Sequence, residues 1–234
     1  MVLISPANSL LVKHHWLLCL LLFLTACQNM PQVQSEPPID ADWLRNIDGF
    51  MQTHQSAYRS HKNLDSWRYS AKVGITTPTS REQANLVWQF ADQANKVRLF
   101  GPLGVGAIKI DFDQNGVELS DNRSVLHRGE SAEDLMTKIV GWPIPIDALR
   151  YWLFALPLPD KAFEYQQDEA GSLAKLRQLG WEIEYPNYKK FFLNDSNINS
   201  DGSQHNYLPS KIIASKQDEK GDLIEVKLIT KGWR

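Results

Sequence analysis

The residues in this sequence that could carry out chemistry are few and scattered. There is no G-x-S-x-G nucleophile motif, no H-E-x-x-H zinc motif and no glycine-rich phosphate loop. His54 and His61 share one face of an expected helix, but they are further apart than metal-binding pairs prefer. An enzyme needs a nucleophile with a base, paired carboxylates in a cleft, or a metal site. We therefore expect no catalytic residue, no metal ligand, no cofactor and no enzymatic activity.

One segment imitates a calcium site. Residues Asp111 to Gly116 read D-F-D-Q-N-G, which copies the opening of an EF-hand loop. That loop requires a bidentate Glu at its twelfth position, where this chain has Asn122. The flanking residues alternate as strands do, so we predict a hairpin turn here instead of a metal site.

The N-terminus points to a covalent modification. An apolar run at residues 16–24 follows Lys13; it is too short to span a bilayer but has the length of a signal-peptide core. It ends in Leu24-Thr25-Ala26-Cys27, which resembles the lipobox of bacterial lipoprotein precursors. That resemblance implies a signal peptide over residues 1–26 and a lipidated Cys27 as the first mature residue. The alternatives are a plain secretory peptide with a chance cysteine, or an uncleaved anchor.

The residues after Cys27 indicate where the mature protein is located. Gln28, rather than Asp, follows the cysteine, and by resemblance to the sorting rule of enteric bacteria this implies the periplasmic face of the outer membrane. Residues 27–41 hold three prolines and no apolar periodicity, so we predict a lipidated, flexible tether. The remainder, residues 42–234, is expected to be a single domain.

Composition narrows the function further. The chain has 234 residues, 43% of them hydrophobic, and a formal net charge of −2. It lacks the clustered basic excess that phosphate binding needs, so we expect no nucleic-acid partner. Its 8 tryptophans suit an amphipathic pocket or a membrane interface, although a solid core would use such rings as well.

Periodicity predicts an α+β domain. Apolar residues recur at helical spacing between Asp42 and Leu64, and alternation with period two begins at Ser66. Two more helices are predicted, from Ser131 to Val140 and from Asp147 to Leu156, and a polar surface loop over Tyr188–Asn206. Expected strands include Lys96–Phe100, Val105–Asp113, Val117–Asp121, Ser124–Arg128, Leu173–Leu179, Trp181–Tyr185, Lys211–Ser215 and Leu223–Thr230. Short connections make them antiparallel, and one curved sheet packed on helices could enclose an apolar cavity.

Two central segments are distinctive. They are Gly101-Pro102-Leu103-Gly104 and the run from Gly141 to Leu153, G-W-P-I-P-I-D-A-L-R-Y-W-L, which closes with Leu156-Pro157. Both segments resemble the LolB family, the outer-membrane lipoprotein receptors. The likeness extends from about Trp43 to the C-terminus. It implies an unclosed antiparallel β-barrel of about eleven strands, covered by about three helices and enclosing an apolar cavity, and we expect a monomer.

The resemblance also implies a function and candidate residues. Members accept lipoproteins from the soluble periplasmic carrier LolA and release them into the outer membrane. Leu103, at the tip of a turn between Pro102 and Gly104, is implied to enter the bilayer; alternatively it folds back onto the sheet edge. Five tryptophans on predicted strands or helix edges are candidates to line an acyl-chain cavity, although for each one taken singly a core position is the favoured alternative: Trp67, Trp88, Trp142, Trp152 and Trp181.

Three rival functions stay open at this point. An anchored scaffolding lipoprotein would bind another envelope protein and carry no lipid. An anchored hydrolase would need convergent acidic or histidine side chains, which the sequence does not suggest. A soluble carrier would lack Cys27.

Overall fold

The computed structural model describes residues 49–50, 66–101, 106–121, 123–192 and 205–234. The chain divides into two compact units, 1–40 and 41–234, and all described residues belong to the second. The predicted signal peptide, Cys27 and the tether therefore lie outside the described residues. So does most of the helix expected between Asp42 and Leu64, of which only Gly49 and Phe50 are described; both are helical and Phe50 is fully buried.

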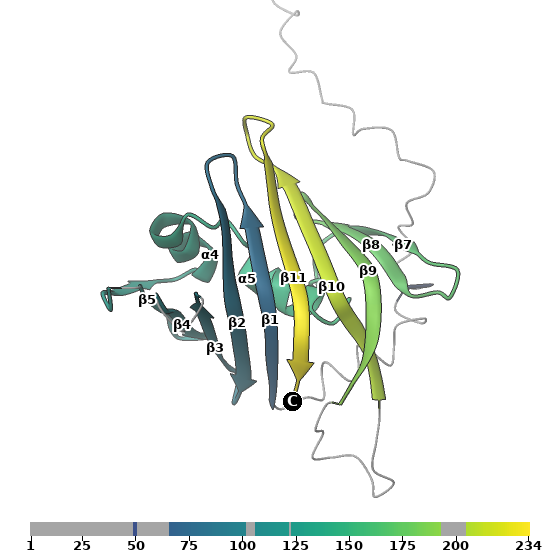
Figure 1. Ribbon diagram of the computed structural model, residues 1–234, viewed down its shortest axis with the longest axis horizontal. Coiled ribbons are helices and arrows are strands. Elements are labelled where there is room, and N and C mark those ends of the chain that lie inside the picture. Colours follow the sequence, from purple (N-terminus) through teal and green to yellow (C-terminus); the bar gives the residue numbers. More distant parts are fainter. Residues whose placement is uncertain (1–48, 51–65, 102–105, 122, 193–204) are drawn as a thin grey trace, which may run out of the picture. The chain divides into compact units, whose positions relative to one another are not determined.

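An 11-stranded antiparallel sheet forms the body of this unit (Figure 1). Its strands run in the order β6-β5-β4-β3-β2-β1-β11-β10-β9-β8-β7, and β6 and β7 are unpaired edges, so the sheet does not close. This confirms the expected unclosed antiparallel architecture. The strands are β1 (Ser66–Thr76), β2 (Arg81–Ala91), β3 (Ala94–Phe100), β4 (Ile108–Asp113), β5 (Gly116–Ser120), β6 (Leu126–Gly129), β7 (Phe163–Gln167), β8 (Leu173–Gln178), β9 (Trp181–Phe192), β10 (His205–Gln217) and β11 (Leu223–Trp233).

The pairing of β1 with β11 joins two meanders into one sheet. Every other pair consists of strands that follow one another in the chain, whereas Tyr69 of β1 is opposite Trp233 of β11. The Tyr69 hydroxyl lies 3.1 Å from the Thr230 hydroxyl across this joint. The centre of the sheet therefore depends on a contact between the two ends of the domain.

Two helical elements are described, α4 (Ala132–Leu135) with the π-helix η2 (Met136–Val140), and α5 (Ile146–Trp152). The Ser131 hydroxyl accepts a hydrogen bond from the Asp134 amide at 3.2 Å, the N-cap that the sequence predicts, and Gly141 ends η2 at φ 80°. α5 lies behind β1, β11 and β10 in Figure 1, so that view looks onto the opposite, outer face of the sheet.

The predicted boundaries of α5 were wrong at its C-terminal end. The helix stops at Trp152 instead of Leu156, because the chain turns through Ala155, whose φ is 56°. The Leu156 amide then donates to the Tyr151 carbonyl at 3.1 Å. This turn keeps the apolar residues Leu153 to Leu156 buried after the helix has ended.

The predicted loop at Tyr188–Asn206 was also wrong at both ends. β9 continues to Phe192 and β10 begins at His205, and residues 193–204 lie outside the described residues. The polar composition, rich in Asn and Ser, predicted a loop, yet the backbones of Lys189 and Lys190 pair with β10. The sequence analysis did not predict β7.

The calcium-like segment is a hairpin turn between β4 and β5, as expected. Asp113 pairs with Gly116, and the Asn115 amide donates to the Asp113 carboxylate at 2.7 Å. The carboxylate is thus occupied by the turn itself.

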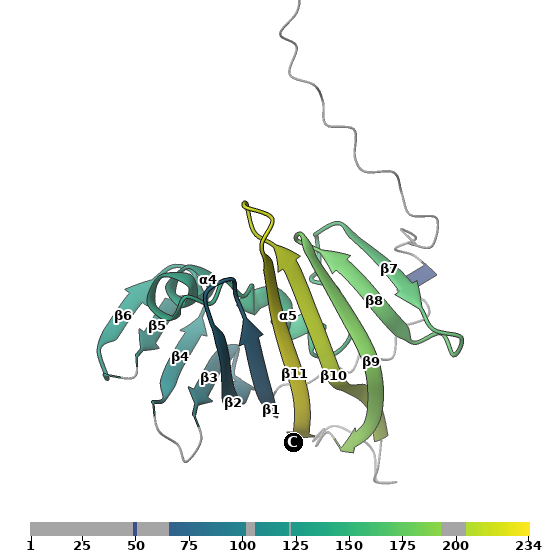
Figure 2. The same cartoon turned by 45° about the horizontal axis from the view of Figure 1, so that its top comes forward.

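Alternation in each strand sends apolar side chains to one inner face, where they meet α5. Figure 2 shows the sheet arching around this helix. α5 is buried on several sides through Ile146, Ala148, Leu149 and Trp152, as expected for a helix enclosed by other elements.

A buried amide fixes the C-terminal end of α5 to β8. Gln178 is 3% exposed; its Oε1 accepts from the Trp152 indole at 3.1 Å and from the Leu158 amide at 2.8 Å, and its Nε2 donates to the Leu158 carbonyl at 2.9 Å. One side chain therefore satisfies the buried Trp152 indole and both backbone groups of the half-buried Leu158.

Replacing this amide should be costly. Gln178→Leu keeps a similar size but leaves the Trp152 indole and the Leu158 backbone unsatisfied, so we expect the free energy of unfolding in urea to fall by about 3 kcal/mol. Gln89→Leu, at an exposed position of β2, is the control and should change it by less than about 0.5 kcal/mol. Equal stabilities of the two variants would contradict the anchoring role.

Stability should also fall at high pH. Burial raises the pKa of the hydroxyls of Tyr69, Tyr185 and Tyr188. In the unfolded chain a tyrosine ionises near pH 10, so these groups stabilise the fold fully below about pH 10 and lose that contribution as the pH rises further. Urea unfolding should show a slope of up to about 4 kcal/mol per pH unit above pH 10, and Tyr69→Phe should reduce it by about a third.

Candidate functional site

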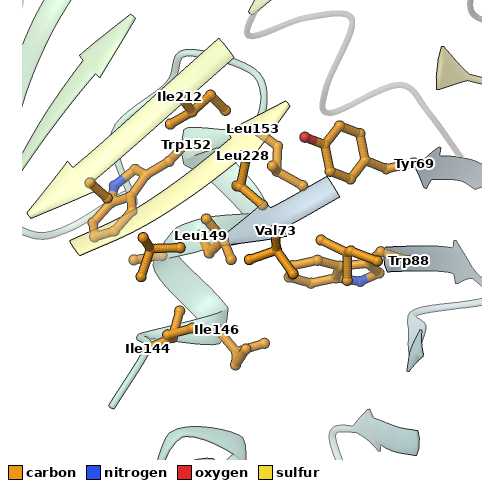
Figure 3. Packing of buried hydrophobic residues seen from close by; sticks show 14 of the residues in the cluster. Tyr69, Val73, Trp88, Ile144, Ile146, Leu149, Trp152, Leu153, Ile212 and Leu228 are labelled. Carbon is orange, nitrogen blue, oxygen red and sulfur yellow. The ribbon is translucent and has the colours of Figure 1, made fainter. Parts of the chain in front are cut away.

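A small apolar cavity lies between the sheet and the helical segment. It is lined from the sheet by Val73, Leu86, Trp88, Val97, Leu99, Val226 and Leu228, and from the helical side by Met136, Trp142, Ile144, Ile146 and Leu149. Figure 3 shows Ile144, Ile146 and Leu149 on one side and Val73, Trp88 and Leu228 on the other, within one packed interior. No charged or carboxamide side chain is among these lining residues.

The cavity is very small. Its volume is about 20 Å³, which is room for about one water molecule, whereas pockets for drug-sized ligands measure about 300–1,000 Å³. An acyl chain therefore fits only if the two walls separate.

The two walls differ in how they are held. The sheet wall belongs to continuous ladders between β3, β2, β1 and β11. The helical wall from Met136 to Ile144 consists of a π-helix and a few local hydrogen bonds. The Trp142 amide donates to the Met136 carbonyl at 3.2 Å, and the Ile144 amide donates to the Trp142 carbonyl at 2.9 Å. Moving the helical wall disrupts side-chain packing but no strand pairing, so it is the wall that can yield.

Arg150, in the last turn of α5, is half-buried, and its guanidinium lies 4.6 Å from the centre of the Phe90 ring. Its Nε is buried and has no hydrogen-bond partner among the described residues. A cation against aromatic rings is favourable, and one buried donor remains unsatisfied.

The five predicted tryptophans are all buried, but they fall into separate environments. Trp88 and Trp142 are among the cavity-lining residues, and the Trp88 indole donates to the buried Asn95 side chain at 3.1 Å. The ring centre of Trp67 lies 5.6 Å from that of Trp233 and 5.7 Å from that of Phe154.

The remaining pair, Trp152 and Trp181, lies 6.3 Å apart, ring centre to ring centre, where Gln178 anchors α5. An acyl-chain role for any of the five stays a prediction.

Several lining residues were not singled out from the sequence, notably Met136, Ile144, Ile146 and Leu149. For the last three the signal was present, because the segment from Gly141 to Leu153 is apolar on more faces than a surface helix would be. Pro102, Leu103 and Gly104 fall between β3 and β4 but lie outside the described residues, as does Cys27.

Other kinds of site were sought in the described part of the chain. It contains no group of three or more His, Cys, Asp or Glu side chains that could hold a metal ion. Within it, no helix has the length and apolar character needed to cross a membrane.

An unclosed antiparallel sheet arched around a helix, with a purely apolar space between them, defines a class of open β-barrels with a lipid-like interior. Residues 65–233 match the family model described as "Outer membrane lipoprotein LolB". The chain therefore belongs to the LolB family.

Individual relatives agree with this assignment. The outer-membrane lipoprotein LolB of Pseudomonas aeruginosa strain LESB58 is 30% identical over 187 residues, which cover 80% of this chain and 82% of the relative. The protein of the same name from Francisella tularensis subsp. tularensis strain WY96-3418 is 29% identical over 180 residues, covering 77% and 79%. Among solved structures, a LolA superfamily protein from Nitrosomonas europaea superposes with a TM-score of 0.44 at 11% identity, covering 77% of this chain and 92% of that one.

Enlarging the cavity should allow it to bind a small apolar molecule. Leu149→Ala removes a lining side chain, so we expect the free energy of unfolding to fall by about 2–5 kcal/mol and benzene to bind in the space created, as judged by NMR shifts. Leu153→Ala removes a fully buried leucine that is not among the lining residues, and is the matched control. Benzene binding that is equal in both variants would show that the cavity is not a preferred site.

Proposed function

We propose that this protein is an outer-membrane lipoprotein receptor that accepts lipoproteins from the periplasmic carrier LolA and inserts them into the outer membrane. The observation that carries the proposal is the apolar cavity between α5 and the sheet, in a chain of the LolB family. Lipidated Cys27 holds the receptor at the periplasmic face of that membrane, and the receptor acts as a monomer without chemical catalysis.

The cost of exposing acyl chains to water explains why such a receptor needs an apolar interior. At about 0.8 kcal/mol per CH₂, a sixteen-carbon chain in water costs roughly 12 kcal/mol, and three chains cost about 35 kcal/mol. A receptor that binds these chains more tightly than the carrier, but less tightly than a bilayer, drives transfer in one direction. Apolar contact alone supplies this gradient.

Loading requires the helical wall to move. The end of α5 near Trp152 is held by Gln178, whereas the stretch from Met136 to Leu149 faces the cavity through side-chain packing. In the proposed cycle this stretch swings away from β1, β2 and β11, an acyl chain takes its place against Val73 and Leu228, and the wall returns on release. Trp88 and Trp142 line that path.

Release is proposed to use the loop between β3 and β4. Leu103, presented by Pro102 and Gly104, enters the bilayer and brings the loaded interior to the lipid surface. Leu103→Glu should slow the transfer of a triacylated lipoprotein from LolA to outer-membrane vesicles by about tenfold or more, because a buried leucine contributes roughly 1.5–3 kcal/mol.

The control for this experiment is Leu126→Glu, which places the same charge at an exposed leucine on β6. It should transfer at the parent rate, and both variants should unfold at the parent urea concentration. Parent-like transfer by a folded Leu103→Glu protein would reject the membrane-facing role. If depletion of the protein in cells leaves no lipoprotein accumulated on LolA, the receptor function itself is wrong, and the scaffolding alternative is favoured.

A further inference from the structure

The outer face of the sheet carries cations that have no acidic partner among the described residues. Six of them lie on β10, β11, β1, β3 and β4, which are five of six adjacent strands, and none of the six lies on the intervening β2. They alternate with buried apolar residues, so they point away from α5. The group, here called the basic face, consists of Arg68, Lys72, Arg98, Lys109, Lys211 and Lys231. Five are exposed and Lys211 is half-exposed; none forms an ion pair within the described part of the chain.

The other wing of the same face is different. On β8 and the first half of β9, cations are matched by carboxylates: Lys175 lies 3.0 Å from Glu184, and Arg177 lies 2.9 Å from Glu182. Further along β9, the exposed Lys189 and Lys190 form no ion pair with a described residue. The carboxylates nearest the basic face lie toward its borders, where Asp111 is the register partner of Lys96 and Glu225 is 3.4 Å from Lys227. Charge is therefore segregated along one sheet.

Two members of the basic face are placed at a cost to the fold. Arg98 and Lys109 are direct register partners on β3 and β4, so two like charges project side by side from the same face. Like charges directly opposite one another destabilise a sheet. The chain as a whole has a formal charge of −2, so this pair is not a by-product of a basic composition.

A second row places an apolar side chain between cations. Ile229 of β11, 41% exposed, is the register partner of both Lys72 and Lys211. Beside it, Gly74 leaves a shallow depression of about 330 Å³, lined in part by Lys72, Asn85 and Ile229. The row thus combines positive charge with a small apolar contact.

We propose that the basic face binds an anionic phospholipid surface and sets the orientation of the domain on the membrane. The proposal rests on the proposed function for the location, since an outer membrane is the surface available to a tethered receptor. Long-range attraction between the six cations and anionic headgroups needs no fitted pocket, and each cation near such a surface raises binding about fivefold. Tethering makes even weak attraction effective, because the local lipid concentration is high.

The geometry favours a lipid surface over an acidic protein. Six adjacent strands spread the charge over roughly 24 Å, because neighbouring strands lie about 4.8 Å apart. In protein–protein interfaces the binding energy is concentrated in aromatic residues near the centre, where charged residues are rare. Between its cations the basic face instead holds the polar Ser70, Asn85 and Gln89. The aliphatic Val87 and Ile229 also lie among them.

The test places a fluorescent donor on Gln89→Cys of the full-length lipidated protein in vesicles whose headgroups carry an acceptor. Gln89 is exposed and is the register partner of Arg68 and Lys96, so the donor reports on the basic face directly. Energy transfer should be higher on phosphatidylglycerol vesicles than on phosphatidylcholine vesicles, and 0.5 M salt should remove the difference.

Two double variants separate charge position from total charge. Arg98→Gln with Lys109→Gln should lower the phosphatidylglycerol-dependent signal about tenfold or more. It should unfold at the same or a higher urea concentration, because a like-charge pair is removed. Lys161→Gln with Lys220→Gln makes the same charge change at exposed turns outside the basic face, and should retain the signal.

Three outcomes would overturn the proposal. The first is equal energy transfer on both lipids, and the second is an equal loss of energy transfer in both double variants. The third is a basic face that stays in water while the Arg98 and Lys109 variant loses affinity for the carrier. The last would assign the face to an acidic protein. The measurement involves no lipoprotein cargo, so a failure here leaves receptor function untouched, and a failure of cargo transfer leaves this result standing.

Discussion

The inner face of the sheet has to be hidden from water, and this constraint governs the rest of the structure. An unclosed sheet cannot bury that face against itself, so the segment from Ile144 to Leu156 occupies the space inside the arch. Apolar contact is non-directional, which lets the same face accept either this segment or a hydrocarbon chain. In the proposed function, stability and lipid binding thus come from one interaction.

Polar contacts restrict that exchange to one part of the cover. Gln178 holds the C-terminal end of α5 through directional hydrogen bonds, and these would be lost if that end moved. The stretch from Met136 to Leu149 faces the cavity with apolar side chains only. The C-terminal end of α5 is therefore fixed. The stretch from Met136 to Leu149 can separate from β1, β2 and β11 without breaking the hydrogen bonds of Gln178.

Strand alternation gives the two faces of the sheet their separate properties. Along β1, the buried Trp67, Tyr69 and Val73 alternate with outward residues that include Arg68 and Lys72. The apolar interior and the basic face are therefore built by alternate residues of the same strands, one position apart.

The sequence by itself determined the local features of this protein. Period-two alternation located most strands, Ser131 marked the start of α4, and the turn after Asp113 followed from a missing calcium ligand. These features depend on neighbouring residues, which a sequence displays directly. Resemblance of the Gly141–Leu153 run to the LolB family supplied the unclosed barrel, which alternation alone left undecided.

Only the tertiary structure decided how distant segments meet: that β1 pairs with β11, that Trp88 and Trp142 line the cavity while Trp67 and Trp152 do not, and that the cavity is almost closed. It also set Arg150 against Phe90 and gathered onto one face cations from five strands that form no ion pair with a described residue. The physical reason is that burial and charge segregation depend on which strands are neighbours in space, and a sequence pattern records only the face to which each side chain points.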